Sequence, residues 1–297
     1  KIGMKQKSKR IPKLTEIRAD LIKELRALTG VCMTKCKEAL QAASGNLQEA
    51  IDYLRKKGMS SGAKKEGRET KEGMIVATQS TTHLVLVEVN VETDFVVQSE
   101  AFRAFAADIA EQALQEEITS LEAFLQKDYA KDPTLSLEQH RNVTIQSLGE
   151  NLQIRRIERI QKESGSSYGI YSHMGGKLVS VVQIAGSETA TKLGQEIAMH
   201  VVACHPEFLC KEEVSQDILA REKEIVCSQM QGKPASVIDK IVAGKRESYF
   251  KENCLREQPF VKDASFTVEK FVENQGKEDG KTLTLARFWR WKVGQEL

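Results

Sequence analysis

Three short helices are predicted near the start of the chain from the spacing of its apolar residues. Gly30 and Gly45 separate the helices, and Asn46 with Glu49 three residues later forms the pattern of a helix N-cap. We therefore expect a helical module over residues 14–57, of a size that often serves as a docking unit. Apolar residues recur with helical period, as on a helix with one buried face, in three segments: 17–28, 36–43 and 47–54.

Two hairpins, each followed by a helix, are predicted further along the chain. Both contain two apolar segments joined by a short polar or glycine-rich turn, which is typical of a β-hairpin. The common plan predicts an internal duplication, with two related α+β halves that each have an antiparallel sheet backed by helices. The segments are strands 74–78 and 83–90 with helix 98–117, then strands 168–173 and 177–184 with a helix around 193–201.

A helical hairpin is expected between the second hairpin and the C-terminal part. Its two helices flank a turn with glycine and proline at 231–234. The expected fold is therefore α+β, with an N-terminal three-helix module, two related subdomains and an inserted helical hairpin. The expected segments are a basic disordered tail 1–13, the module 14–57, a linker 58–72, a first core half 73–165, a second half 166–204, the hairpin 205–256 and a final part 257–297 that completes the second half.

Charge is distributed unevenly along the chain. Residues 1–13 hold six Lys or Arg and no acidic side chain, so the remainder carries 38 basic against 42 acidic side chains. A nucleic-acid-binding protein usually has its basic surface on the folded part, and we therefore expect no nucleic-acid partner. No apolar segment is long enough for a membrane span and no secretory segment is present. These features predict a cytoplasmic protein without a membrane partner, with its six cysteines reduced.

Candidate chemical sites in the sequence are incomplete. His200 and Cys204 lie one helical turn apart, but a structural zinc site needs four ligands and a catalytic one three, so packed core residues are expected there. Gly276 to Thr282 resembles a phosphate-binding loop but is one residue short, which favours a turn. No nucleophile has an identifiable base. We expect no enzyme activity, cofactor, metal or direct nucleotide binding, and a thiol or zinc hydrolase remains a remote third hypothesis.

Thr93, Asp94, Phe95 and Val96 form a turn after the second predicted strand. A ring beside a carboxylate has two interpretations in such a turn. Phe95 could close the chain's own core, because aromatic side chains are more often buried than exposed. Alternatively, Phe95 could project and enter a crevice of a partner as an apolar anchor. The local sequence fits both interpretations equally well.

Two longer segments resemble the signatures of the elongation factor Ts family. They are residues 25–40, LRALTGVCMTKCKEAL, and residues 88–96, EVNVETDFV. The matching motifs span about residues 14–292 and follow one another in the same order as in the family. Shorter similar motifs lie at 149–151, 154–156, 171–173, 197–201 and 258–261.

The resemblance implies a nucleotide-exchange factor for elongation factor Tu, a GTPase, in translation. It also implies that the three-helix module is UBA-like, and it leaves open a homodimer through the helical hairpin. The residues expected to disturb the partner's magnesium site are Thr93, Asp94, Phe95 and Val96. The other expected partner contacts are Val31, Cys32 and Met33 in the module, and His173 in the second half.

This sequence departs from the family pattern at Cys32, Val97 and Met174, which stand where the family usually has smaller residues. The alternative function is a non-exchanging adaptor, which would use the three-helix module to hold a partner without affecting its nucleotide.

Overall fold

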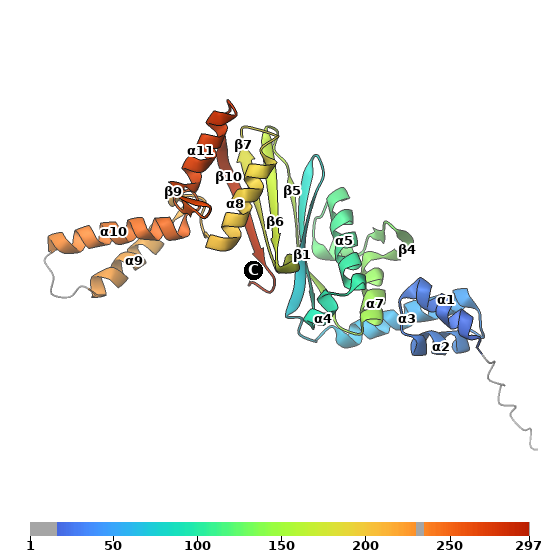
Figure 1. Cartoon of the computed structure of the whole chain (residues 1–297). Helices are drawn as coiled ribbons and strands as arrows, with labels where there is room; N and C mark the ends of the chain where they lie inside the picture. Colours follow the sequence, from blue (N-terminus) through green and yellow to red (C-terminus); the bar gives the residue numbers. More distant parts are fainter. Residues whose placement is uncertain (1–16, 230–234, 297) are drawn as a thin grey trace, which may run out of the picture. The chain divides into compact units, whose positions relative to one another are not determined.

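The computed structural model describes residues 17–229 and 235–296 and contains two compact units (Figure 1). The predicted α+β class is confirmed. The tail over 1–13 and the turn over 231–234 lie outside the described residues. Unit 1 contains residues 17–72, 91–112 and 117–153, and unit 2 contains 73–90, 113–116 and 154–296.

The N-terminal part of unit 1 is the predicted three-helix module. Its helices are α1 (Ala19–Thr29), α2 (Met33–Ala42) and α3 (Leu47–Lys65). Gly30 ends α1 in the left-handed conformation, and Asn46 caps α3 by accepting the backbone N–H of Glu49. The buried core of the module is Ile22, Leu25, Val31, Cys36, Ala39, Leu40, Ala43, Ala50 and Leu54.

α3 continues eight residues beyond the predicted end of the module, so the first part of the expected linker 58–72 is helical. The glycines that suggested a linker instead allow helices to approach closely. A Cβ atom at Gly62 would lie only 1.7 Å from Oδ1 of Asn142, which is on α7. Glycine at this position therefore serves the packing of α3 on α7.

The remainder of unit 1 combines short helices with a small hairpin. The elements are α4 (Asp94–Val97), α5 (Glu100–Gln115, with its last residues in unit 2), α6 (Leu121–Leu125), β3 (Asp128–Tyr129), β4 (Asp132–Ser136) and α7 (Leu137–Leu148). Ser136 and Gln139 form a capping box at the start of α7.

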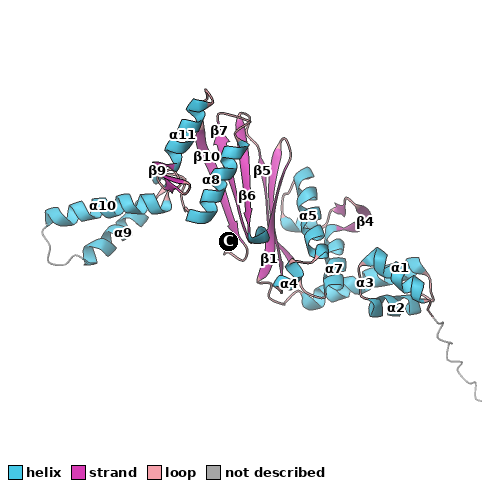
Figure 2. Ribbon diagram, in the orientation of Figure 1, coloured by secondary structure: helices cyan, strands magenta, loops and turns pink. Residues whose placement is uncertain are grey.

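Unit 2 contains two three-stranded sheets, in the orders β1-β2-β5 and β10-β7-β6 (Figure 2). A common apolar cluster joins residues of both sheets, including Leu84, Leu86, Val179, Val181 and Trp289. The strands are β1 (Glu72–Gln79), β2 (His83–Val91), β5 (Leu152–Gln161), β6 (Ser166–His173), β7 (Leu178–Ala185) and β10 (Thr284–Lys292).

The other elements of unit 2 are helical apart from one small hairpin. They are η1 (Met174–Gly176), α8 (Thr191–Cys204), η2 (Lys211–Glu213), α9 (Gln216–Gln229), α10 (Ala235–Asn253), β8 (Pro259–Phe260), β9 (Asp263–Thr267) and α11 (Val268–Glu278). α8 packs so closely on β6 that a Cβ atom at Gly169 would lie 2.0 Å from the backbone of Gly194.

The second half repeats the elements of the first in the same order. The series β1, β2, α5, β3, β4, α7, β5 corresponds to β6, β7, α8, β8, β9, α11, β10, with α9 and α10 inserted. The small hairpins agree in detail: Asp132 accepts the backbone N–H and hydroxyl of Thr134, and Asp263 accepts those of Ser265. The duplication predicted from the sequence is therefore confirmed.

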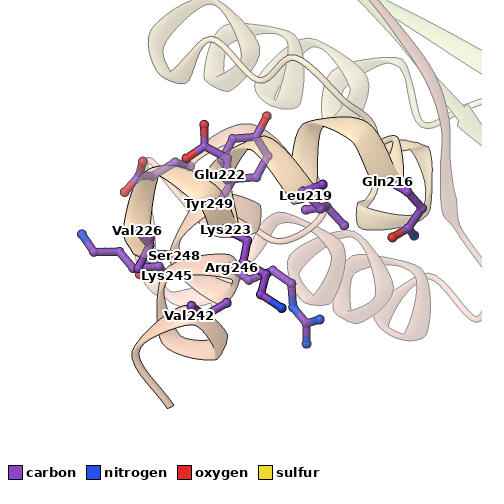
Figure 3. A pocket seen from close by; sticks show the side chains of 12 residues that line it. Gln216, Leu219, Glu222, Lys223, Val226, Val242, Lys245, Arg246, Ser248 and Tyr249 are labelled. Atoms are coloured by element: carbon purple, nitrogen blue, oxygen red, sulfur yellow. The ribbon is translucent and has the colours of Figure 1, made fainter. Parts of the chain in front are cut away.

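α9 and α10 form the expected helical hairpin (Figure 3). A groove of about 480 Å³ lies between them. Apolar side chains such as Leu219 and Val242 line it together with both acidic and basic ones, for example Glu222 and Arg246.

Candidate partner-binding site

Phe95 is the most exposed large apolar side chain of the described residues, with 85% of its surface accessible. It lies in α4, a helix of four residues that follows Thr93 as its N-cap. Asp94 is exposed and Val96 half-buried, whereas Val97 at the end of α4 is buried and anchors it. The interpretation of Phe95 as a ring that closes the chain's own core is therefore wrong.

A carboxylate of unit 1 holds the start of α4. Glu150 follows Gly149, the left-handed residue that ends α7, and accepts two hydrogen bonds from Thr93. The backbone N–H of Thr93 donates to Oε2 at 2.9 Å, and its hydroxyl donates to Oε1 at 2.7 Å. Because both carboxylate oxygens are used, the position and orientation of Thr93 are fixed.

Glu92 is held on the other side of the same chain segment. The backbone N–H of Asn151 donates to Oε1 of Glu92 at 2.6 Å, and Nη1 of Arg68 lies 3.4 Å from that oxygen. The side-chain amide of Asn151 donates to the carbonyl oxygen of Arg68 at 2.8 Å. We call Glu92, Thr93, Glu150 and Asn151 the Thr93 clamp. In the sequence these residues lie in two separate motifs, and the sequence pattern alone assigns Glu150 no role.

The loop between α1 and α2 exposes only part of the predicted docking surface. Val31 is 1% exposed and belongs to the module's own core, so its side chain is not available to a partner. Cys32 is exposed and Met33 is 44% exposed. Leu28, which the apolar spacing placed with the buried face, is 62% exposed. It lies six residues beyond Ile22, about 120° around the helix.

His173 is exposed at the end of β6 in unit 2. Its Nδ1 lies 3.3 Å from the hydroxyl of Tyr171, and the two rings stack with 6.0 Å between their centroids. Met174 follows with a left-handed backbone, φ 51°, and 69% of its surface exposed. Unit 2 therefore presents an imidazole and a thioether side chain together at this turn.

Comparison with known proteins identifies the family of the chain. The sequence model of the family described as "Elongation factor TS" matches residues 92–295. The chain is 48% identical over 275 residues to "Elongation factor Ts" of Protochlamydia amoebophila (strain UWE25), which covers 93% of this chain and 98% of that protein. The chain belongs to the elongation factor Ts family. It is also 45% identical over 281 residues to "Elongation factor Ts" of Chlamydia pneumoniae, over 95% of this chain and 100% of that one.

Some residues in the motifs shared with the elongation factor Ts family serve the fold. Glu88 is fully buried, with its Oε2 2.8 Å from Nε of Arg156 and its Oε1 accepting the backbone N–H of Gly294. The guanidinium of Arg156 also lies 3.9 Å from the ring centroid of Trp291. The buried carboxylate of Glu88 is thus paired with the half-buried guanidinium of Arg156, and this contact holds unit 2 together.

His200 is confirmed as a packed core residue. It is fully buried, its Nε2 lies 2.8 Å from Oε1 of Gln258, and its Nδ1 accepts the backbone N–H of Val261 at 3.1 Å. Both ring nitrogens are therefore occupied. Burial lowers the pKa of His200. Within the described residues, no group of three or more metal-ligating side chains comes together.

The segment that resembles a phosphate-binding loop is only partly the expected turn: Gly276 to Glu278 are the last residues of α11, and residues 279–283 lead from it to β10. Its Lys281 ammonium donates to the hydroxyls of Ser187 and Thr189 at 3.0 and 2.9 Å. No helix within residues 17–229 and 235–296 has both the length and the apolar character needed to cross a membrane.

Unit 1 also contains a cavity of about 330 Å³ beside Tyr129 and His140. Their rings stack with centroids 4.0 Å apart, and the Tyr129 hydroxyl donates to Asp108. The corresponding rings of the second half, Phe260 and Phe271, stack in the same way at 4.3 Å. Since the stack persists without polar atoms, its shared role is packing.

Proposed function

We propose that this chain is a nucleotide-exchange factor that binds elongation factor Tu in its GDP-bound form and promotes GDP release during translation elongation. Membership of the elongation factor Ts family implies exchange on that partner. The exposed Phe95 ring on a fixed backbone is the observation that carries the finer proposal, in which the ring acts as a wedge.

The proposed mechanism is a thermodynamic coupling between two ligands of the GTPase. Magnesium bridges protein and phosphate oxygens in such sites and neutralises much of the phosphate charge. A side chain that displaces the groups around the metal weakens the hold on GDP. The factor and GDP then lower each other's affinity for the GTPase by the same factor. No covalent bond is made or broken in this process.

In this mechanism, Phe95 supplies apolar surface and Asp94 supplies charge beside it. A phenylalanine that is 85% exposed gains little from the fold of its own chain, and it buries its ring only when a partner covers it. Met33, Cys32 and Leu28 would dock on the same GTPase domain, and His173 with Met174 would contact a further domain of elongation factor Tu.

The replacement Phe95→Ala tests the wedge. We expect GDP release from elongation factor Tu, followed by stopped-flow fluorescence of a labelled GDP, to slow by about 30-fold, since a buried aromatic anchor contributes about 2 kcal/mol. Phe266→Ala is the matched control, because Phe266 is also exposed but lies on β9 of unit 2. This control is expected to release GDP at the wild-type rate.

Wild-type release by folded Phe95→Ala would contradict the wedge. Binding of the unaltered chain to elongation factor Tu without any acceleration of release would contradict exchange altogether and favour the adaptor. The homodimer through the hairpin of α9 and α10 remains a prediction, which sedimentation of the free chain would test.

A further inference from the structure

The Thr93 clamp has a counterpart in the second half of the chain. Glu150 and Lys281 each lie 13 positions after the first residue of α7 or α11, Leu137 and Val268. Each follows a glycine with a left-handed backbone and reaches a threonine that lies just before an earlier helix, Thr93 before α4 and Thr189 two residues before α8. Glu150 binds Thr93, and Nζ of Lys281 lies 2.9 Å from the hydroxyl of Thr189.

The two clamps differ in the groups that they hold. The side chain of Lys281 donates to the hydroxyls of Ser187 and Thr189, and the backbone N–H of Thr189 donates to the Ser187 hydroxyl. Glu150 accepts both the hydroxyl and the backbone N–H of Thr93 directly. The clamping side chain of the first half therefore binds the main chain of its threonine directly, whereas that of the second half binds the threonine hydroxyl and reaches the main chain through Ser187.

The residues next to the two clamped threonines are also different. After Thr189 comes Ala190, a small residue packed against the core of unit 2. After Thr93 come the exposed side chains of Asp94 and Phe95. The fold thus uses a clamp in both halves, and the exposed aromatic tip follows the threonine whose backbone N–H the clamping side chain binds directly.

We propose that Glu150 is a positioning residue for exchange, whose carboxylate fixes the direction in which Phe95 leaves the chain. The ring is too exposed to be oriented by its own contacts, and α4 has only four residues, so the backbone at Thr93 sets its direction. A tip already held in its bound direction loses less conformational freedom when it inserts. The effect on GDP release rests on the proposed function, whereas the effect on Thr93 concerns the free chain alone.

Four variants separate positioning from general stability. Glu150→Ala removes both acceptors, and Thr93→Val removes the hydroxyl donor but keeps the backbone N–H. Thr93→Ser restores the hydroxyl. Lys281→Ala opens the corresponding clamp of the second half, where no exposed ring depends on it. Thermal unfolding identifies the variants that fold, and if Glu150→Ala does not fold, the Thr93→Val and Thr93→Ser pair decides.

Two measurements report on the clamp. In the free chain, hydrogen exchange of the Thr93 amide, followed by NMR, is expected to accelerate at least tenfold in Glu150→Ala, because its acceptor is gone. In stopped-flow GDP release, the maximal rate is expected to fall about tenfold, since only a fraction of complexes has the tip in place. The half-saturating concentration should change less than about threefold, because the other docking contacts remain. Lys281→Ala should match the wild type in both. Thr93→Val should slow release as Glu150→Ala does, and Thr93→Ser, which keeps the hydroxyl donor, should recover most of that loss.

A wild-type maximal rate and unchanged Thr93 exchange in Glu150→Ala would overturn the proposal. Slower release with unchanged Thr93 exchange would also overturn it, since Glu150 would then act by touching the partner. So would a Lys281→Ala chain that releases GDP as slowly as Glu150→Ala. If instead Phe95→Ala keeps the wild-type rate, the proposed function fails, and the exchange of the Thr93 amide still tests the clamp.

Discussion

At the scale of single residues, Met174 has an unfavourable backbone conformation and an exposed apolar side chain. Its left-handed backbone, φ 51°, is unfavourable for a residue with a side chain, and its thioether is 69% exposed. Gly175 and Gly176, which follow it, also have positive φ but carry no side chain. A strained, exposed apolar residue beside His173 fits a contact with a partner better than a contribution to the fold.

Replacing Met174 with glycine tests this strain. We expect Met174→Gly to change the free energy of unfolding by between about 0 and +1 kcal/mol, because relief of strain offsets the greater freedom of glycine in the unfolded chain. Met33→Gly is the control, an exposed methionine at the first position of α2, and should lower stability by up to about 1 kcal/mol, because no strain is relieved there. Urea unfolding measures both, and a loss above about 1 kcal/mol in Met174→Gly would show that its side chain stabilises the fold.

At the scale of elements, the stack of Tyr129 on His140 is expected to make the stability of unit 1 depend on pH. Burial lowers the pKa of His140, against the opposing effect of Asp108 and Asp132. The unfolded chain therefore takes up a proton at His140 at a higher pH than the folded chain does, so stability falls as the pH drops below about 6.5. His200, whose pKa burial also lowers, contributes in the same direction from unit 2.

The ring stack of the second half suggests a substitution that removes the titrating imidazole from unit 1. His140→Phe places a phenylalanine ring on Tyr129, at the position that Phe271 has in the second half, and we expect the variant to lose less stability than the wild type between about pH 7 and pH 5. Urea unfolding at several pH values measures the difference, and the dependence that remains should come from groups such as His200. An equal loss of stability in His140→Phe and wild type would show that His140 does not titrate in this range on unfolding.

Elements with regular apolar patterns could be predicted from the sequence, whereas α7, whose pattern is interrupted by buried polar residues, could not. The three-helix module, both hairpins and α8 follow from apolar spacing. The buried positions of α7 include Asn142, Thr144 and Gln146, which hide its helical period. The partner of Thr93 could not be predicted either, because Glu150 lies 57 positions away and is brought near only by the fold.

The exposure of Phe95 could not be predicted for a related reason. The sequence Thr–Asp–Phe–Val fits a ring that closes a core as well as one that projects, and only the accessible surface separates the two. Conversely, the valine of the predicted docking loop, Val31, is apolar enough to complete the core of the three-helix module, and the fold buries it there.

At the scale of the whole molecule, the proposed function requires binding alone. Unit 1 carries Phe95, Met33 and Cys32, and unit 2 carries His173, so both units contribute proposed contacts. Such a protein changes the affinity of its partner for a nucleotide without binding the nucleotide itself. Its effect on the partner is then limited by the difference between its affinities for the GDP-bound and the nucleotide-free states.

The most direct test of this coupling is the reciprocity of the two affinities. The affinity of elongation factor Tu for GDP is measured with and without saturating chain, and the affinity for the chain with and without GDP. We predict that both affinities fall by the same large factor. We also predict that Phe95→Ala brings this factor close to one. An affinity for GDP that the bound wild-type chain leaves unchanged would contradict the coupling.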